Sequence, residues 1–240
     1  MPALRVLVFQ HHDSEGPGTL GTFLRRDGGS IDTVHFTHGD VIPALEAYDQ
    51  LWVMGGPMDV WDLKDHPWLA DEKRAIRRFV RDLQRPVLGV CLGHQLLADA
   101  LGGTCGPLSP PEIGVIPVTM TAAAADDPLL GTLPETWPCV QWHGVHVAEL
   151  PDGAVHLGSS EQCGVQAARF APRAWGIQGH IEVEERTVRD WACVPAYRSA
   201  LDALQGTGAI DRFDADAQRN MALFQSLAEA VYRNLMSIAR

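Results

Sequence analysis

Short apolar segments alternate with helical segments through the first hundred residues, and this alternation limits the possible folds more than any other feature. Apolar or β-branched runs predict strands at 4–9, 30–36, 50–54 and 87–90. Helices are predicted at 19–26, 68–83 and 95–101, with at best a short helix at 42–48. Strand–helix repeats with short connections predict a doubly wound, mostly parallel α/β sheet.

The second half changes character. Strands are predicted at 114–120, 139–147, 154–158, 165–170 and 174–178 with little helix between them, and we expect them to add to the sheet as antiparallel strands. Two helical segments follow, 184–205 interrupted by Pro195 and an amphipathic closing helix at 214–238. We find no repeat or linker, so the sequence predicts a single domain over residues 1–240.

Composition excludes several classes of function. The net charge of −11 argues against nucleic acid or an anionic membrane as the main partner, and no apolar run reaches the ~20 residues that span a bilayer. The first residues are expected to form a strand and not a signal peptide. The five cysteines are scattered without C-x-x-C spacing, which predicts reduced thiols in a cytoplasmic protein. With no phosphate-binding loop and no dinucleotide G-x-G-x-x-G, we expect no cofactor.

Cys91 stands where the strand at 87–90 runs into the following helix. Gly89 and Gly93 flank it in the pattern G-x-C-x-G, which is the geometry of a nucleophile elbow with sulfur in place of oxygen. Amides at the start of the helix then point towards the sulfur and favour a thiolate. The alternative is a buried structural cysteine, but the glycines on both sides favour a nucleophile.

A thiol nucleophile needs a base and a group that orients the base. His180 follows the apolar strand at 174–178, and Glu182 lies two residues further, on the same side of an extended backbone. Other histidines are weaker candidates. His11-His12 ends the first strand near the expected site, whereas His143 and His146 have H-x-x-H spacing with no acidic or cysteine partner nearby in sequence, so no metal site is expected.

These motifs, in this order, resemble the class I (triad-type) glutamine amidotransferases, especially the stand-alone GMP-synthase-like members. The resemblance runs from Arg5 to about Glu184 and implies a flavodoxin-like fold. It rests on Met54-Gly-Gly-Pro-Met58, Pro67-Trp-Leu69, Gly89-Val-Cys-Leu-Gly-His-Gln-Leu-Leu97, Gln141-Trp-His-Gly144 and Gly176-Ile-Gln-Gly-His-Ile-Glu182.

The resemblance implies a mechanism. Cys91 would attack the side-chain amide of glutamine and form a γ-glutamyl thioester, His180 would activate the thiol and protonate the departing ammonia, and Glu182 would orient His180. Backbone amides of Gly56 and Leu92 would form the oxyanion hole. Water would then release glutamate.

The resemblance also implies substrate contacts and a partner. Gln95, Gly144 and Val145 would hold the amino acid part of the substrate. The chain contains no synthetase domain, so any transfer of ammonia would need a separate acceptor protein.

Three positions depart from the family pattern. Gly179 and Ile181 replace the usual aromatic and proline around His180, and the glycine is expected to loosen the backbone that holds the base. Val145 replaces an acidic residue that could pair with the α-ammonium group of glutamine. Two alternatives therefore stay open beside glutamine hydrolysis: a γ-glutamyl peptidase acting on γ-glutamyl peptides or amines, and a non-catalytic binding protein on the same scaffold.

Overall fold

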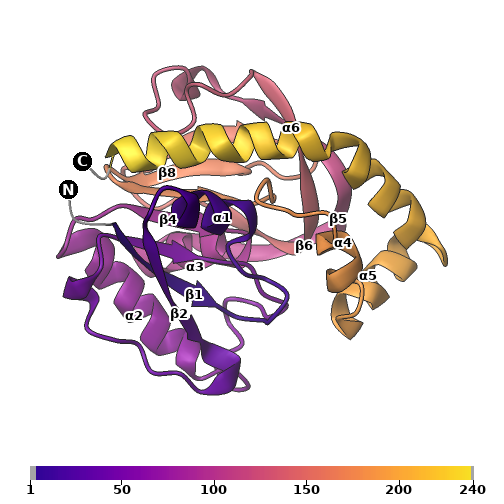
Figure 1. Ribbon diagram of the computed structural model, residues 1–240. Coiled ribbons are helices and arrows are strands. Elements are labelled where there is room, and N and C mark those ends of the chain that lie inside the picture. Colours follow the sequence, from indigo (N-terminus) through magenta and orange to yellow (C-terminus); the bar gives the residue numbers. More distant parts are fainter. Residues whose placement is uncertain (1–3, 239–240) are drawn as a thin grey trace.

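A mixed nine-stranded sheet forms the centre of the computed structural model, which describes residues 4–238 (Figure 1). Its order is β2-β1-β3-β4-β9-β8-β7-β5-β6. The first five strands in this order are parallel: β2 (Ser30–His35), β1 (Arg5–Gln10), β3 (Gln50–Val53), β4 (Val87–Val90) and β9 (Ala174–Ile177). The other four pair antiparallel: β8 (Ala167–Ala171), β7 (Val155–Ser159), β5 (Thr104–Met120) and β6 (Thr136–Glu149). The expected α/β sheet with antiparallel additions is confirmed.

One strand of the second half departs from the expectation. We predicted that 174–178 would be antiparallel, but β9 pairs parallel to β4, with Leu88 opposite Trp175. Strand β9 is fully buried, because it lies between β4 and β8 in the middle of the sheet. A four-residue apolar run does not specify its neighbour, so the direction of pairing could not be read from it.

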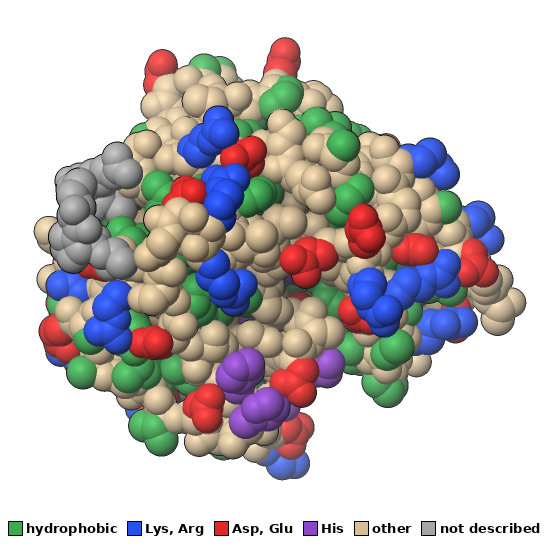
Figure 2. All heavy atoms as spheres, in the orientation of Figure 1, with side chains coloured by type: hydrophobic (Ala, Val, Ile, Leu, Met, Phe, Trp, Pro, Cys, Tyr) green, Lys and Arg blue, Asp and Glu red, His purple; other side chains and the backbone are tan. Residues whose placement is uncertain are grey.

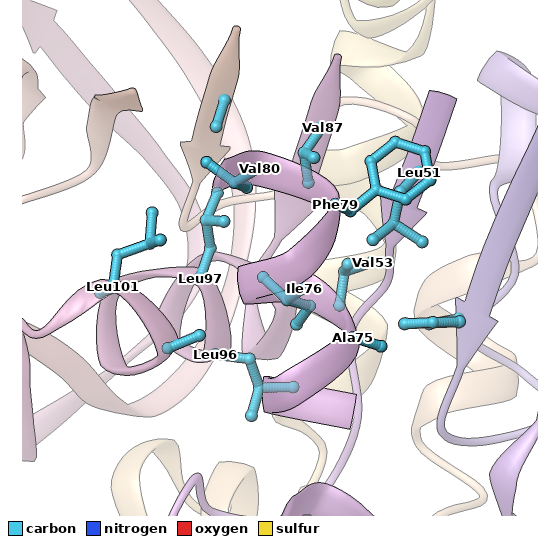
Figure 3. Close-up of a cluster of buried hydrophobic side chains, with 14 of the residues drawn as sticks. Leu51, Val53, Ala75, Ile76, Phe79, Val80, Val87, Leu96, Leu97 and Leu101 are labelled. Carbon is cyan, nitrogen blue, oxygen red and sulfur yellow. The ribbon is translucent and has the colours of Figure 1, made fainter. Parts of the chain in front are cut away.

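Helices cover both faces of the sheet. On one face, α2 (Trp68–Arg81) and α3 (Leu92–Leu101) pack against the parallel strands (Figure 3). On the other face lie α1 (Gly18–Arg26) and the long closing helix α6 (Ala209–Ile238). Their buried apolar side chains divide between two clusters on opposite faces, as the period of 3.6 in each helix requires. The segment 42–48 contains only the 3₁₀ turn Leu45–Ala47.

Two short helices interrupt the path to the closing helix. Pro195 prevents the predicted segment 184–205 from forming one helix: α4 (Thr187–Trp191) precedes it, and α5 (Pro195–Gln205) begins at it. Both pack with α6 and with the β5–β6 hairpin around Trp142. No helix within residues 4–238 is long and apolar enough to cross a membrane.

The topology gathers the predicted motifs at one edge of the sheet. Parallel strands β1, β3, β4 and β9 end at this edge, where doubly wound sheets place their sites. The backbone of Val140 in β6 exchanges two hydrogen bonds with His180, of 3.0 and 2.8 Å. The hairpin therefore reaches the end of β9 and brings the segment 141–145 to the site.

Candidate active site

Cys91 occupies a sharp turn between β4 and α3. Its φ of 53° and ψ of −108° are unfavourable for any residue with a side chain, at a cost on the order of 1–3 kcal/mol. The turn needs glycine on both sides, because a Cβ on Gly93 would lie 1.9 Å from the Val53 carbonyl oxygen and one on Gly89 would lie 2.4 Å from that of Gly93. The Cys91 N–H donates to Ile177 O at 2.9 Å, which ties the turn to β9. The elbow geometry is that expected from G-x-C-x-G.

His180 and Glu182 form a buried pair beside the cysteine. The Nδ1 atom of His180 lies 2.6 Å from Oε1 of Glu182, and the two side chains are 3% and 5% exposed. Burial disfavours the imidazolium ion, but the neighbouring Glu182 and Cys91 outweigh it, so the pKa of His180 is raised well above its usual range. Its ring also meets the edge of Trp191, with centroids 4.5 Å apart. This histidine is therefore placed to hold a proton next to the cysteine.

His94 lies closer to Cys91 in sequence but is a poor base. It is fully buried against Phe170, and burial lowers its pKa to about 3, so the ring stays neutral.

Gly179 does not loosen the backbone, contrary to the expectation from sequence. A Cβ there would lie 2.3 Å from Sγ of Cys139 and 2.6 Å from Nε2 of Gln141. The adjacent His180 is fixed by its two backbone hydrogen bonds to Val140. Gly179 is thus required by close packing, and the base is held firmly.

A small cavity of about 80 Å³ lies next to Cys91. Its walls come from 56–59, 91–95 and 142–145 together with Tyr197. Gly56 and Leu92, the predicted oxyanion donors, both line it, and neither backbone N–H donates to another group among residues 4–238. Two unused donors thus face the space in which the amide oxygen of a substrate would lie.

The predicted substrate residues Gln95, Gly144 and Val145 line the same cavity. Both protons of the Gln95 amide are used inside the protein, to Val145 O at 3.0 Å and to Oε1 of Gln178 at 3.1 Å. Gln178 in turn places its Nε2 3.6 Å from the Cys91 sulfur. Gln95 therefore has only its carbonyl oxygen to offer a ligand, and Gln178 joins the site although its sequence context did not single it out.

Glu15 and Tyr197 were also missed. The Tyr197 side chain lines the cavity, and its hydroxyl donates to Oε1 of Glu15 at 2.5 Å. Burial raises the pKa of Glu15, which the Tyr197 bond and His180 partly counteract. These residues lie 182 positions apart, so no local pattern could have joined them.

His143 has buried partners that its sequence context does not reveal. Its Nε2 lies 3.0 Å from Oε2 of Glu112, and Cys163 is close enough that the three ligand atoms lie within 4.8 Å of one another. The expectation that no acidic or cysteine partner is near is therefore wrong in space. Glu112 also accepts from Ser160 and Gln166, so the group is already bound in a hydrogen-bond network.

Comparison with known proteins identifies the family. The model of the family described as glutamine amidotransferase class-I matches residues 24–190. The chain belongs to the class-I glutamine amidotransferases.

Relatives of this amidotransferase agree with that assignment. A subunit of GMP synthase (glutamine-hydrolysing) from Halobacterium salinarum is 36% identical over 163 residues, covering 67% of this chain and 80% of the relative. A putative glutamine amidotransferase-like protein, YfeJ of Salmonella typhimurium, is 28% identical over 184 residues, covering 75% and 76%. Among solved structures, a glutamine amidotransferase from Thermotoga maritima has a TM-score of 0.86 at 26% identity and covers 98% of this chain and 99% of its own.

Proposed function

We propose that this amidotransferase hydrolyses the γ-amide of glutamine through a γ-glutamyl thioester on Cys91. One observation above all supports this reaction: the strained elbow at Cys91, the buried His180–Glu182 pair and two unused backbone donors surround a single cavity. A nucleophile, its base and an oxyanion site are what amide cleavage by a thiol requires.

The reaction follows from these positions. His180 takes the proton of the Cys91 thiol, and the sulfur attacks the amide carbon of the substrate. The amide oxygen becomes an anion, which accepts from the N–H groups of Gly56 and Leu92. The C–N bond then breaks, and His180 returns its proton to the leaving nitrogen, which departs as ammonia. Water attacks the thioester with His180 as base, and glutamate leaves while the thiol is restored.

Glu182 supports this cycle electrostatically. Its carboxylate accepts from Nδ1 of His180, so Nε2 of the ring is left for proton exchange with Cys91 and substrate. The imidazolium that forms beside the thiolate is stabilised by the buried negative charge.

An acidic residue for the α-ammonium group of the substrate is available at Asp59. Val145 has no charge, but Asp59 lines the same cavity from the segment that follows Gly56. Burial and the neighbouring Asp62 raise the pKa of Asp59, so a bound ammonium group would favour its ionised form. This supports a substrate with a free amino group, as glutamine has.

The acceptor of the ammonia would lie on another protein. Relatives named as GMP synthase subunits support a separate synthetase protein as the partner. We propose that the chain itself is a single domain acting in the cytoplasm, since one sheet with its helices accounts for residues 4–238. Acidic and basic side chains are interspersed on the face in Figure 2, which offers no continuous basic area to nucleic acid.

The test is release of glutamate from glutamine and from γ-glutamyl peptides by the wild type and by Cys91→Ala. We expect release from glutamine by the wild type only. Cys139→Ala is a matched control, because Cys139 is buried and lies outside the cavity lining. Release from γ-glutamyl peptides alone would favour a γ-glutamyl peptidase, and equal rates in wild type and Cys91→Ala would refute a cysteine-dependent enzyme.

A further inference from the structure

His11 touches the loop that carries one of the two oxyanion donors. It follows β1, and the loop Gly55-Gly56 follows β3, which pairs parallel to β1 with Phe9 opposite Val53. Nδ1 of His11 lies 2.9 Å from the Gly55 carbonyl oxygen. Nε2 lies 2.9 Å from Oε1 of Glu72 in α2. Both side chains are fully buried.

The geometry of one peptide unit links this pair to the reaction. The carbonyl of Gly55 and the N–H of Gly56 belong to the same peptide, which is trans, so they point in opposite directions. A carbonyl oxygen can only accept a hydrogen bond, so Nδ1 of His11 carries a proton and donates it. Holding the oxygen from one side therefore aims the N–H of Gly56 to the other side, where this residue lines the Cys91 cavity.

We propose that the buried His11–Glu72 pair is a positioning device that orients and polarises the Gly55–Gly56 peptide of the oxyanion hole. This inference rests on the proposed amide hydrolysis. His11 and Glu72 do not touch the substrate; they act through the peptide.

The environment of His11 supports a charged ring. Glu72 faces its second nitrogen, and the rings of Trp68 and Phe36 stack on it with centroids 5.6 and 5.7 Å away. Burial opposes protonation, but Glu72 and the Gly55 carbonyl outweigh it, and the pKa of His11 is raised. A cation bound at the carbonyl oxygen polarises the whole peptide and makes its N–H a stronger donor.

Close packing leaves the loop little freedom to choose another orientation. A Cβ on Gly56 would lie 2.6 Å from Cβ of His11, and one on Gly55 would lie 2.2 Å from Oε2 of Glu15. The peptide is thus enclosed between His11 on one side and the catalytic cavity on the other. The tilt of the peptide is set by what binds its oxygen.

The experiment separates positioning from general support of the fold. Turnover of glutamine and of γ-glutamyl-p-nitroanilide passes through an oxyanion, whereas alkylation of Cys91 by iodoacetamide is a direct displacement that forms none. We would measure kcat, KM and the alkylation rate for the wild type, His11→Leu, His11→Asn and Glu72→Gln. Phe79→Leu, in the same helix as Glu72 and fully buried away from the site, controls for loss of packing.

We expect His11→Leu to lose about 10- to 100-fold in kcat, somewhat less than deletion of an oxyanion donor, with KM and alkylation within about twofold. His11→Asn keeps a donor near the position of Nδ1 and should recover most of the loss. Glu72→Gln keeps the link but not the charge and should fall between them. Phe79→Leu should leave kcat unchanged.

Two results overturn the proposal. One is an unchanged kcat in His11→Leu; the other is a parallel fall of kcat and alkylation, which would mark a structural role only. If the wild type itself turns over neither substrate, the proposed function fails and this inference fails with it, which distinguishes that outcome from a failure confined to the His11 variants.

Discussion

Replacing Glu182 with glutamine isolates the charge that holds His180. The side chains are nearly isosteric, and the glutamine oxygen can still accept from Nδ1 at the position of Oε1. The other oxygen of Glu182 is buried without a partner among the described residues, so the new NH₂ group would have no acceptor there. The substitution thus keeps the orienting bond, removes the negative charge and adds a small cost in stability.

The size of the effect follows from the bond that changes. A hydrogen bond between charged groups contributes about 1.5–3 kcal/mol and a neutral one about 0.5–1.5 kcal/mol, so roughly 1–1.5 kcal/mol is lost. At about 1.4 kcal/mol per decade, this corresponds to a fall of roughly tenfold in kcat/KM for glutamine. Solvent screening does not reduce this figure much, because both side chains are at most 5% exposed.

The pH dependence gives a second readout with a definite sign. The pKa of His180 is raised in the folded protein, so its contribution to stability is complete below the unfolded value of about 6.5 and is lost as pH rises through the folded pKa. The difference in unfolding free energy between wild type and Glu182→Gln should therefore be larger at pH ~6 than at pH ~9. The alkaline limb of kcat/KM should move to lower pH in the variant.

Glutamate release and urea unfolding across this pH range provide the assay. Glu184→Gln is the matched control, since it makes the same chemical change at an exposed position two residues further along the chain. Wild-type kcat/KM together with an unmoved alkaline limb in Glu182→Gln would refute the assignment of Glu182 as the partner of the base.

Three further predictions test other parts of the site. Gly179→Ala should cost about 1–3 kcal/mol in urea unfolding and lower activity, with part of the loss restored by adding Cys139→Ala; a fully stable, active Gly179→Ala would contradict the packing argument. Asp59→Asn should raise KM for glutamine roughly two- to fivefold with kcat little changed, because the site is only partly buried, and the exposed Asp65→Asn should not; equal KM values would remove Asp59 from substrate binding. Tyr197→Phe should cost about 1–3 kcal/mol, because it leaves the buried Glu15 carboxyl without its donor, and unchanged stability would show that this bond contributes little.

Much of the fold and the triad could be predicted from local patterns. The strand–helix alternation specifies parallel pairing up to β4, and the glycines around Cys91 specify the turn. His180 and Glu182 lie two residues apart on an extended segment, so their contact is also local. The signals that succeeded all act within a few residues of the chain.

What could not be predicted depends on packing between distant segments. Gly179 suggests freedom in sequence, but Cys139 and Gln141 arrive from β6 and fill the space beside it. The same hairpin carries His143 to Glu112. A strand's pattern reports whether its faces are buried and not which side chains bury them.

The positions of these residues along the chain separate shared chemistry from local control. Cys91, His180 and Glu182 lie inside the stretch 24–190 that the family model matches, as do both oxyanion donors. His11, Glu15 and Tyr197 lie outside it, yet His11 holds the Gly55 carbonyl, and Tyr197 binds Glu15 beside His180. The proposed reaction is therefore carried by the shared part of the chain, while the groups that tune its oxyanion peptide and enclose its base come from the first strand end and from α5. Substitutions in those two segments are expected to alter rate and specificity without removing the reaction itself.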